Sequence, residues 1–138
     1  PPAFWQDFLV MTSVEQPIAL FFVLLKTYKI LFDFHVNVTI RRWNSVAKSV
    51  NNDDILMEFN EISARDAFVD SWSEATKNKV ISTYLSILRR IGMLNRTYQL
   101  QVPHCTNYPY YLQIGEPWFL EACLLQPYQI EKIKNSLV

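Results

Sequence analysis

The chain has 138 residues; half are hydrophobic and 14% are aromatic, which is enough apolar material for the core of one domain. Its 13 basic and 13 acidic residues balance, which argues against the strongly basic surface of many nucleic-acid-binding domains. Only two glycines are present, and this scarcity favours helices joined by short loops over a β-rich fold with many turns.

The sequence shows no secretory signal and no stretch long enough to cross a membrane. The apolar run from Ile18 to Leu25 is much shorter than the roughly 20 residues that a spanning helix needs. We therefore expect a cytoplasmic chain in which this run forms part of a buried helix. Because the first residue is Pro rather than Met, we also expect the chain to be a piece of a longer protein.

Residues 1–50 are predicted to be an N-terminal helical segment that packs on the rest of the fold. An aromatic-rich short helix or arm comes first, and a long helix follows from Ile18 to about Phe32. The next residues are ambiguous: apolar and polar side chains alternate between 34 and 40, as in a strand, but apolar residues also recur at helical spacing as far as Ala47. The helical pattern is the longer one, so we favour a helix here.

Residues 51–103 are predicted to form a winged helix-turn-helix. The polar residues 51–54 can cap a helix that begins at Ile55, and its apolar residues recur at helical spacing. A short helix or turn is expected near 64–70, with Phe68 and Val69 packing inward.

The stretch from Ser71 to Arg96 is the centre of this prediction. Ser71 and Glu74 have the Ser-x-x-Glu spacing of a capping box, and Ser73 is a second candidate cap. At ~100° per residue, apolar side chains share one broad arc of the predicted helix. The opposite arc is basic and rich in hydroxyls, with no acid after Glu74, and such a face suits phosphate groups or base edges.

Gly92 stands where a helix C-terminal glycine is expected. Polar and apolar residues then alternate over 98–102 and end at Pro103, which predicts a short β-hairpin. Helix, glycine and hairpin together match the recognition helix and wing of a winged helix-turn-helix. The alternative is a structural helix with a solvated polar face, followed by a hairpin of no special function.

Residues 104–138 are predicted to be a C-terminal loop and helices that pack on the same core. Pro117 and Pro127 each stand at the start of a helical pattern, a position that tolerates proline. The predicted fold class is therefore mainly α, a helical domain with a winged helix-turn-helix and a small β-hairpin wing.

Few residues are suited to catalysis. His35, close to Asp33, and His104, next to Cys105, are the only histidines, and no nucleophile motif accompanies either. Adjacent side chains of an extended segment point to opposite faces, so His104 and Cys105 do not form a base and its nucleophile. The two cysteines lack metal-site spacing, and we expect free thiols, with a disulfide as the alternative. We predict no enzyme, no metal, no cofactor and no small-molecule substrate.

Charge is unevenly distributed along the chain. Two basic segments, 24–50 and 71–100, flank the acidic segment 51–70, so a basic face can form within a neutral chain. We select polar side chains of the central helix and one arginine of the predicted wing as candidate DNA-contacting residues: Thr76, Lys77, Asn78, Lys79, Thr83, Arg89, Arg90 and Arg96.

Three stretches resemble the BrxA family, small proteins of bacterial BREX phage-defence systems. They are residues 24–44 (LLKTYKILFDFHVNVTIRRWN), 73–94 (SEATKNKVISTYLSILRRIGML) and 117–125 (PWFLEACLL), and none is a catalytic signature. The resemblance implies a cytosolic, mostly helical, non-enzymatic protein with winged-helix modules that binds double-stranded DNA and has other defence-system proteins as partners. It also implies that the family extends further at the N-terminus.

The neutral net charge and a predicted wing with Arg96 as its only basic residue depart from what strong DNA binding requires. We predict a double-stranded DNA-binding component of a phage-defence system. The alternative is a protein-interaction scaffold whose winged helix contacts another defence protein.

Overall fold

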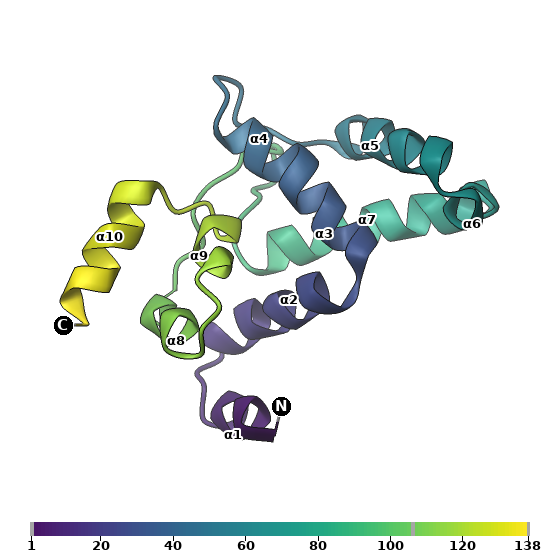
Figure 1. Ribbon diagram of the computed structural model, residues 1–138. Coiled ribbons are helices and arrows are strands. Elements are labelled where there is room, and N and C mark those ends of the chain that lie inside the picture. The colour runs from purple at the N-terminus through teal and green to yellow at the C-terminus, as the bar shows by residue number, and fades with distance from the viewer. Residues whose placement is uncertain (1, 106, 138) are drawn as a thin grey trace.

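The computed structural model describes residues 2–105 and 107–137, and their regular secondary structure is helical (Figure 1). Pro1, Thr106 and Val138, which fall within segments discussed above, lie outside the described residues. The prediction of a mainly α fold is confirmed. The elements in chain order are α1 (Pro2–Leu9), α2 (Glu15–Thr27), α3 (Lys29–Phe34), the π-helix η1 (His35–Thr39), α4 (Ile40–Trp43), α5 (Asn52–Arg65), α6 (Ala67–Asp70), α7 (Glu74–Arg90), α8 (Tyr108–Gln113), α9 (Trp118–Ala122) and α10 (Pro127–Ser136).

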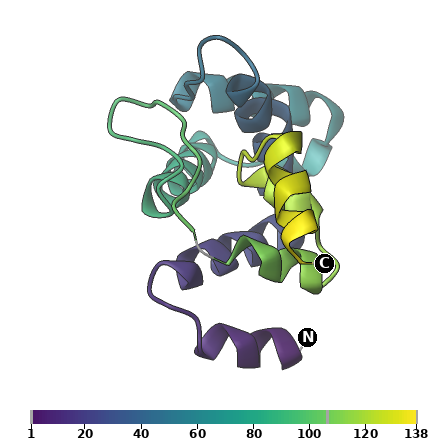
Figure 2. The same cartoon turned by 90° about the vertical axis from the view of Figure 1, so that its left-hand side faces the viewer.

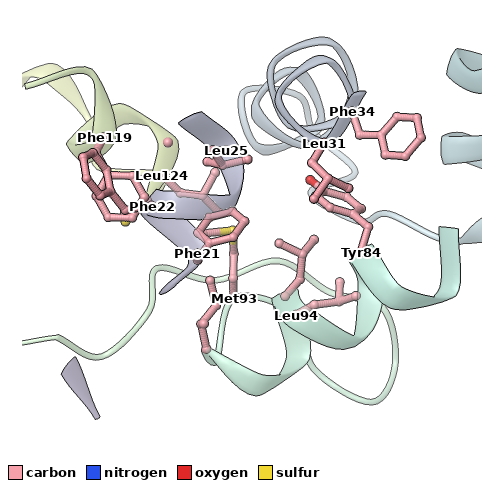
Figure 3. Packing of buried hydrophobic residues seen from close by; sticks show 14 of the residues in the cluster. Phe21, Phe22, Leu25, Leu31, Phe34, Tyr84, Met93, Leu94, Phe119 and Leu124 are labelled. Atoms are coloured by element: carbon pink, nitrogen blue, oxygen red, sulfur yellow. The ribbon is translucent and has the colours of Figure 1, made fainter. Parts of the chain in front are cut away.

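Helix α2 supplies much of the core, as its apolar sequence predicts. Phe21 and Phe22 are buried and lie between α9 and the end of α7, near Phe119 and Met93 (Figure 3). The Phe22 ring centre is 5.2 Å from that of Phe119 in an edge-to-face arrangement, a geometry that aromatic pairs favour. Each such buried aromatic contributes roughly 1.5–3 kcal/mol of hydrophobic stabilisation.

The ambiguous segment is helical as far as Trp43, which confirms the favoured interpretation for residues 34–43, but the helix does not continue to Ala47 as the apolar spacing predicts, because residues 44–50 form a loop. α3, η1 and α4 follow one another without a break, and η1 is a wider turn in which backbone hydrogen bonds span five residues instead of four. His35 and Thr39 stand at the two ends of η1, and both are completely buried.

These two side chains meet Tyr84 of α7 in a buried hydrogen-bond network. His35 Nε2 lies 2.6 Å from the carbonyl oxygen of Ala122, which can only accept, so Nε2 carries the proton. Nδ1 of the neutral ring then accepts from the Tyr84 hydroxyl at 2.7 Å, and that hydroxyl accepts from Thr39 at 2.6 Å. The network joins η1 to α7 and α9 and fixes the rotation of α7 about its axis.

Helix α5 is capped from within the predicted polar segment 51–54, by Asn51, but it begins at Asn52 rather than at Ile55. The Asn51 side chain accepts from the Asp54 backbone N–H, and the Asp54 carboxylate accepts from the Asn51 backbone N–H, forming a reciprocal capping box. The short helix α6 follows at once and buries Val69. Phe68 does not pack inward as predicted: it is 72% exposed and touches Trp72 edge-on at 6.0 Å. A four-residue helix can bury only one side, and Val69 occupies it.

Helix α7 begins and ends with recognisable caps. Ser73, not Ser71, is the N-cap, and its hydroxyl accepts from the Thr76 backbone N–H at 3.1 Å. At the other end Gly92 has φ +80°, and the Met93 N–H donates to the carbonyl oxygen of Leu88 at 2.9 Å. Together with the bond from the Gly92 N–H to the Arg89 carbonyl oxygen at 3.1 Å, this bond forms a Schellman motif, for which glycine is the preferred residue. The predicted role of Gly92 is thus confirmed, whereas the predicted Ser71–Glu74 box is wrong.

The predicted β-hairpin is not found in the described residues, where backbone pairing after α7 is limited to isolated bridges. Leu94 pairs with Leu100, and Gln99 pairs with Ser49, which precedes α5. The backbone of residues 98–100 divides its hydrogen bonds between Asn95 on one side and Lys48 and Val50 on the other, so neither pairing extends into strands. An irregular loop therefore follows α7, which we call the turn 93–101, and backbone hydrogen bonds join it to the loop 44–50 (Figure 2).

The C-terminal helices complete the core through α8 and α9, which bury Tyr111 and Phe119, while α10 lies at the periphery of the fold (Figure 1). Within residues 2–105 and 107–137, no helix combines the length and the apolar character that crossing a membrane requires.

Candidate nucleic-acid interface

The outer side of α7 presents a continuous polar surface. Because α7 packs inward through Ile81, Tyr84 and Leu88, its opposite side faces solvent. The exposed side chains line a shallow depression of about 270 Å³ together with half-buried Ile87; we call these side chains the α7 stripe: Lys79, Ser82, Thr83, Ser86 and Arg90.

The charges of the α7 stripe are available to a ligand. Lys79 and Arg90 are exposed and form no ion pair with another described residue. They lie eleven residues apart, which is about 16 Å along a helix, with hydroxyl groups between them. Two cations at the ends of a row of hydroxyls suit a phosphate backbone, because hydroxyls can donate to phosphate oxygens or to base edges.

Three of the sequence-predicted residues, Lys79, Thr83 and Arg90, belong to the α7 stripe, and all of the predicted residues except Lys77 are exposed. Thr76, Asn78 and Arg96 are exposed, as are Lys79, Thr83, Arg89 and Arg90. Lys77 is 6% exposed: its ammonium lies 5.8 Å from the centre of the Phe59 ring and 4.0 Å from the Glu74 carboxylate. Lys77 therefore points into the junction between α5 and α7 rather than toward a ligand on the α7 stripe.

The turn 93–101 stands beside the end of α7 and brings one more side chain to the surface. The Tyr98 ring lies under the Arg89 guanidinium, with 4.9 Å between the Arg89 Cζ and the ring centre. The turn is shaped by Asn95, whose side-chain oxygen accepts from the backbone N–H groups of Thr97 and Gln99 at 2.9 Å. Nothing in the sequence pattern selects Tyr98, because its contact with Arg89 depends on how the turn folds back.

The residues considered for catalysis have structural partners instead. Asp33 does not contact His35; its carboxylate lies 2.9 Å from the Lys29 ammonium. Burial lowers the pKa of His35 to about 4, against the smaller opposing effect of its bond to Ala122, so the ring is neutral. A ring whose two nitrogens are both occupied by fixed hydrogen bonds has no free site for a substrate proton.

The thiols are similarly protected. Cys105 and Cys123 are both free, which answers the disulfide alternative. Burial raises the pKa of each thiol, and the Cys105 thiol donates to the Asn107 side-chain oxygen at 2.9 Å. The part of the chain that the structure describes contains no cluster of three or more His, Cys, Asp or Glu side chains that could hold a metal ion.

Comparison with known proteins shows which family the chain belongs to. The sequence profile of the BrxA family matches residues 2–108, from α1 through the turn 93–101 and into the start of α8. The chain belongs to the BrxA family. As a BrxA-family protein it is a component of a BREX system, and the matched region contains the whole α7 stripe. Neither the curated proteins nor the solved structures gave a match to this BrxA chain.

Proposed function

We propose that this BrxA-family chain is a non-enzymatic component of its BREX system that binds double-stranded DNA in the cytoplasm through the α7 stripe. In this proposal α6 and α7 act as a helix-turn-helix, with α7 in the role of recognition helix, and the turn 93–101 acts as a reduced wing. Other proteins of the same defence system are its expected protein partners.

The observation that carries the proposal is the α7 stripe itself, an exposed, acid-free surface with unpaired cations at both ends. A helix face that only contacts solvent is expected to carry acids as well as bases, because alternating opposite charges stabilise an exposed helix more than charges of one sign do. The stripe offers hydroxyls rather than bidentate groups between its cations, so we expect phosphate contacts to dominate and sequence discrimination to be modest.

The non-enzymatic part of the proposal is supported by the environment of the reactive groups. The His35 ring is buried with both nitrogens engaged, and both thiols have pKa values raised by burial. These environments disfavour proton transfer and nucleophilic attack.

A protein-interaction scaffold is the second candidate, and exposed apolar side chains favour it. Met57 of α5 and Phe68 of α6 are 69% and 72% exposed, on a segment rich in acids. Large exposed apolar side chains are more typical of protein contacts than of DNA contacts.

Salt-titrated binding to a duplex DNA tests the proposal. The variant Lys79→Ala/Arg90→Ala should bind more weakly than the parent, and the slope of log K against log salt should become shallower by about 1.8 if both cations contact phosphate. Because both side chains are exposed, the stability should change by only about ±0.5 kcal/mol per site.

The matched control is Lys132→Ala/Lys134→Ala, which removes the same charge from exposed positions on α10, away from α7 in both views (Figures 1 and 2). This control should keep the parent's salt slope. If the α7 variant binds DNA as tightly as the parent does, the stripe is not the DNA surface. If the parent shows no binding at low salt, the scaffold function is favoured.

A further inference from the structure

Arg89 differs from the two cations of the α7 stripe because its guanidinium has a fixed neighbour. Arg90 follows it in the chain and is therefore rotated by about 100° around the helix axis, so Arg89 stands at the edge of the exposed side. A long side chain at such an edge has several rotamers that point away from the stripe. The contact with the Tyr98 ring selects one of them.

The Tyr98 ring can hold Arg89 in one rotamer because the Tyr98 backbone is itself held in place. Tyr98 has φ +62°, in the left-handed region that non-glycine residues rarely adopt. Its carbonyl oxygen accepts from the Val50 N–H at 3.1 Å, and the Leu100 N–H donates to the Lys48 carbonyl oxygen at 2.8 Å. A strained backbone conformation persists only where the surrounding contacts hold it in place, and such strain is often found at functional positions.

A glycine at this position would meet the backbone requirement without strain. The chain instead has a tyrosine that is 37% exposed and belongs neither to the buried core nor to the half-buried side chains packed against it. The ring's main contact with a charged group is the stack with Arg89. A guanidinium stacked on an aromatic face still presents its N–H donors at its edge, where a phosphate can accept them.

We propose that Tyr98 is a positioning residue of the DNA interface: its ring holds the Arg89 guanidinium at the edge of the α7 stripe, ready to donate to a backbone phosphate. The loop 44–50 contributes by fixing the Tyr98 backbone. This inference rests on the proposed DNA binding and adds to it a pre-organised contact, which saves part of the side-chain ordering cost of association.

The test is a double-mutant cycle read by salt-titrated binding to the same duplex. Arg89→Ala should weaken binding roughly fivefold to tenfold at about 0.1 M salt and make the salt slope shallower by about 0.9. Tyr98→Leu keeps every charge, yet it should reproduce most of that loss. The combined variant should bind no more weakly than Arg89→Ala alone, because the two residues act through one contact.

Two further variants separate positioning from folding. Tyr98→Phe keeps the ring and should bind as the parent does. Tyr98→Gly removes the ring but suits a left-handed backbone, so its melting temperature should be equal to or above the parent's while its affinity falls as in Tyr98→Leu.

The outcomes distinguish this inference from the proposed function. Parent-like binding by Tyr98→Leu, alongside weak binding by Arg89→Ala, overturns the role of Tyr98 and leaves DNA binding by the α7 stripe intact. Losses that multiply in the combined variant also overturn it, because they show that the two residues act independently. If the parent has no salt-dependent affinity for DNA, both the proposed function and this inference are wrong.

Discussion

His35 is a polar side chain in the middle of an apolar core, and its protonation state is set by what surrounds it. Burial lowers its pKa to about 4, whereas an unfolded chain leaves a histidine near 6.5. Between these values the unfolded state binds more protons than the folded state does, so the free energy of unfolding falls as the pH falls. Above pH 6.5 both states are neutral, and the histidine contributes no pH dependence.

We therefore expect the protein to lose about 2 kcal/mol of stability through His35 when the pH is lowered from 7 to 5. Urea unfolding at the two pH values measures the loss. The control is His35→Phe, which is less stable at both pH values because the Tyr84 hydroxyl and the Ala122 carbonyl oxygen lose a partner. The carboxylates are unchanged in this variant, so its smaller loss between pH 7 and 5 isolates the histidine. An equal loss in both proteins would show that His35 titrates normally and is not buried as described.

Some features of a helix can be predicted from the sequence more easily than others. In α7 the buried arc and the C-terminal end were predicted, but the start was not. Its buried arc and its glycine stop follow from periodicity and backbone sterics, which are local properties. Its start was harder to place, because Ser71 and Ser73 both fit a cap pattern and the short helix α6 ends only at Asp70. Ser71 instead belongs to the end of α6, where its hydroxyl donates to the Phe68 carbonyl oxygen.

Replacing the two serines in turn tests which one caps α7. Ser73→Ala should lower the free energy of unfolding by about 1 kcal/mol, because the Thr76 N–H loses its acceptor. Ser71→Ala removes an equivalent hydroxyl two residues earlier and should change it by less than about 0.5 kcal/mol. Urea denaturation of both variants gives the comparison. A larger effect at Ser71 would mean that α7 begins earlier than the structure shows.

Parts of the candidate site that depend on tertiary packing could not be predicted from the sequence. Lys77 lies next in sequence to exposed Thr76 and Asn78, but it is buried because α5 brings the Phe59 ring over it. The hairpin pattern of 98–102 was overridden because residues 98–100 share their hydrogen bonds with the distant loop 44–50. The Arg89–Tyr98 stack follows from that same pairing. Local pattern thus predicts the α7 stripe, while its neighbours depend on contacts between segments far apart in the chain.

At the scale of the whole molecule, zero net charge reflects a separation of charges rather than their absence. The acids of residues 51–70 belong mostly to α5 and α6, and the side of α5 that carries Asn60 and Glu61 is exposed. The other side of α5, with Ile55 and Phe59, packs inward, so these acids lie away from the α7 stripe. Contacts on the stripe are short-range, but the approach of DNA is governed by the field of all charges. The acidic helix is therefore expected to slow association while leaving the dissociation rate unchanged.

The variant Asn60→Lys/Glu61→Lys tests this separation, because it raises the net charge from 0 to roughly +3 at exposed positions remote from the stripe. At low salt its association rate with duplex DNA should rise several-fold, while its dissociation rate stays that of the parent, since no direct contact changes. The gain should shrink toward zero at about 0.15 M salt and above, where screening acts within about 8 Å.

Glu61→Gln, which removes one negative charge and adds none, should give a smaller increase of the same kind. Stopped-flow association and dissociation measurements separate the two rates. A dissociation rate that falls as much as the association rate rises would mean that α5 itself contacts DNA, and the interface would then have to be extended to that helix.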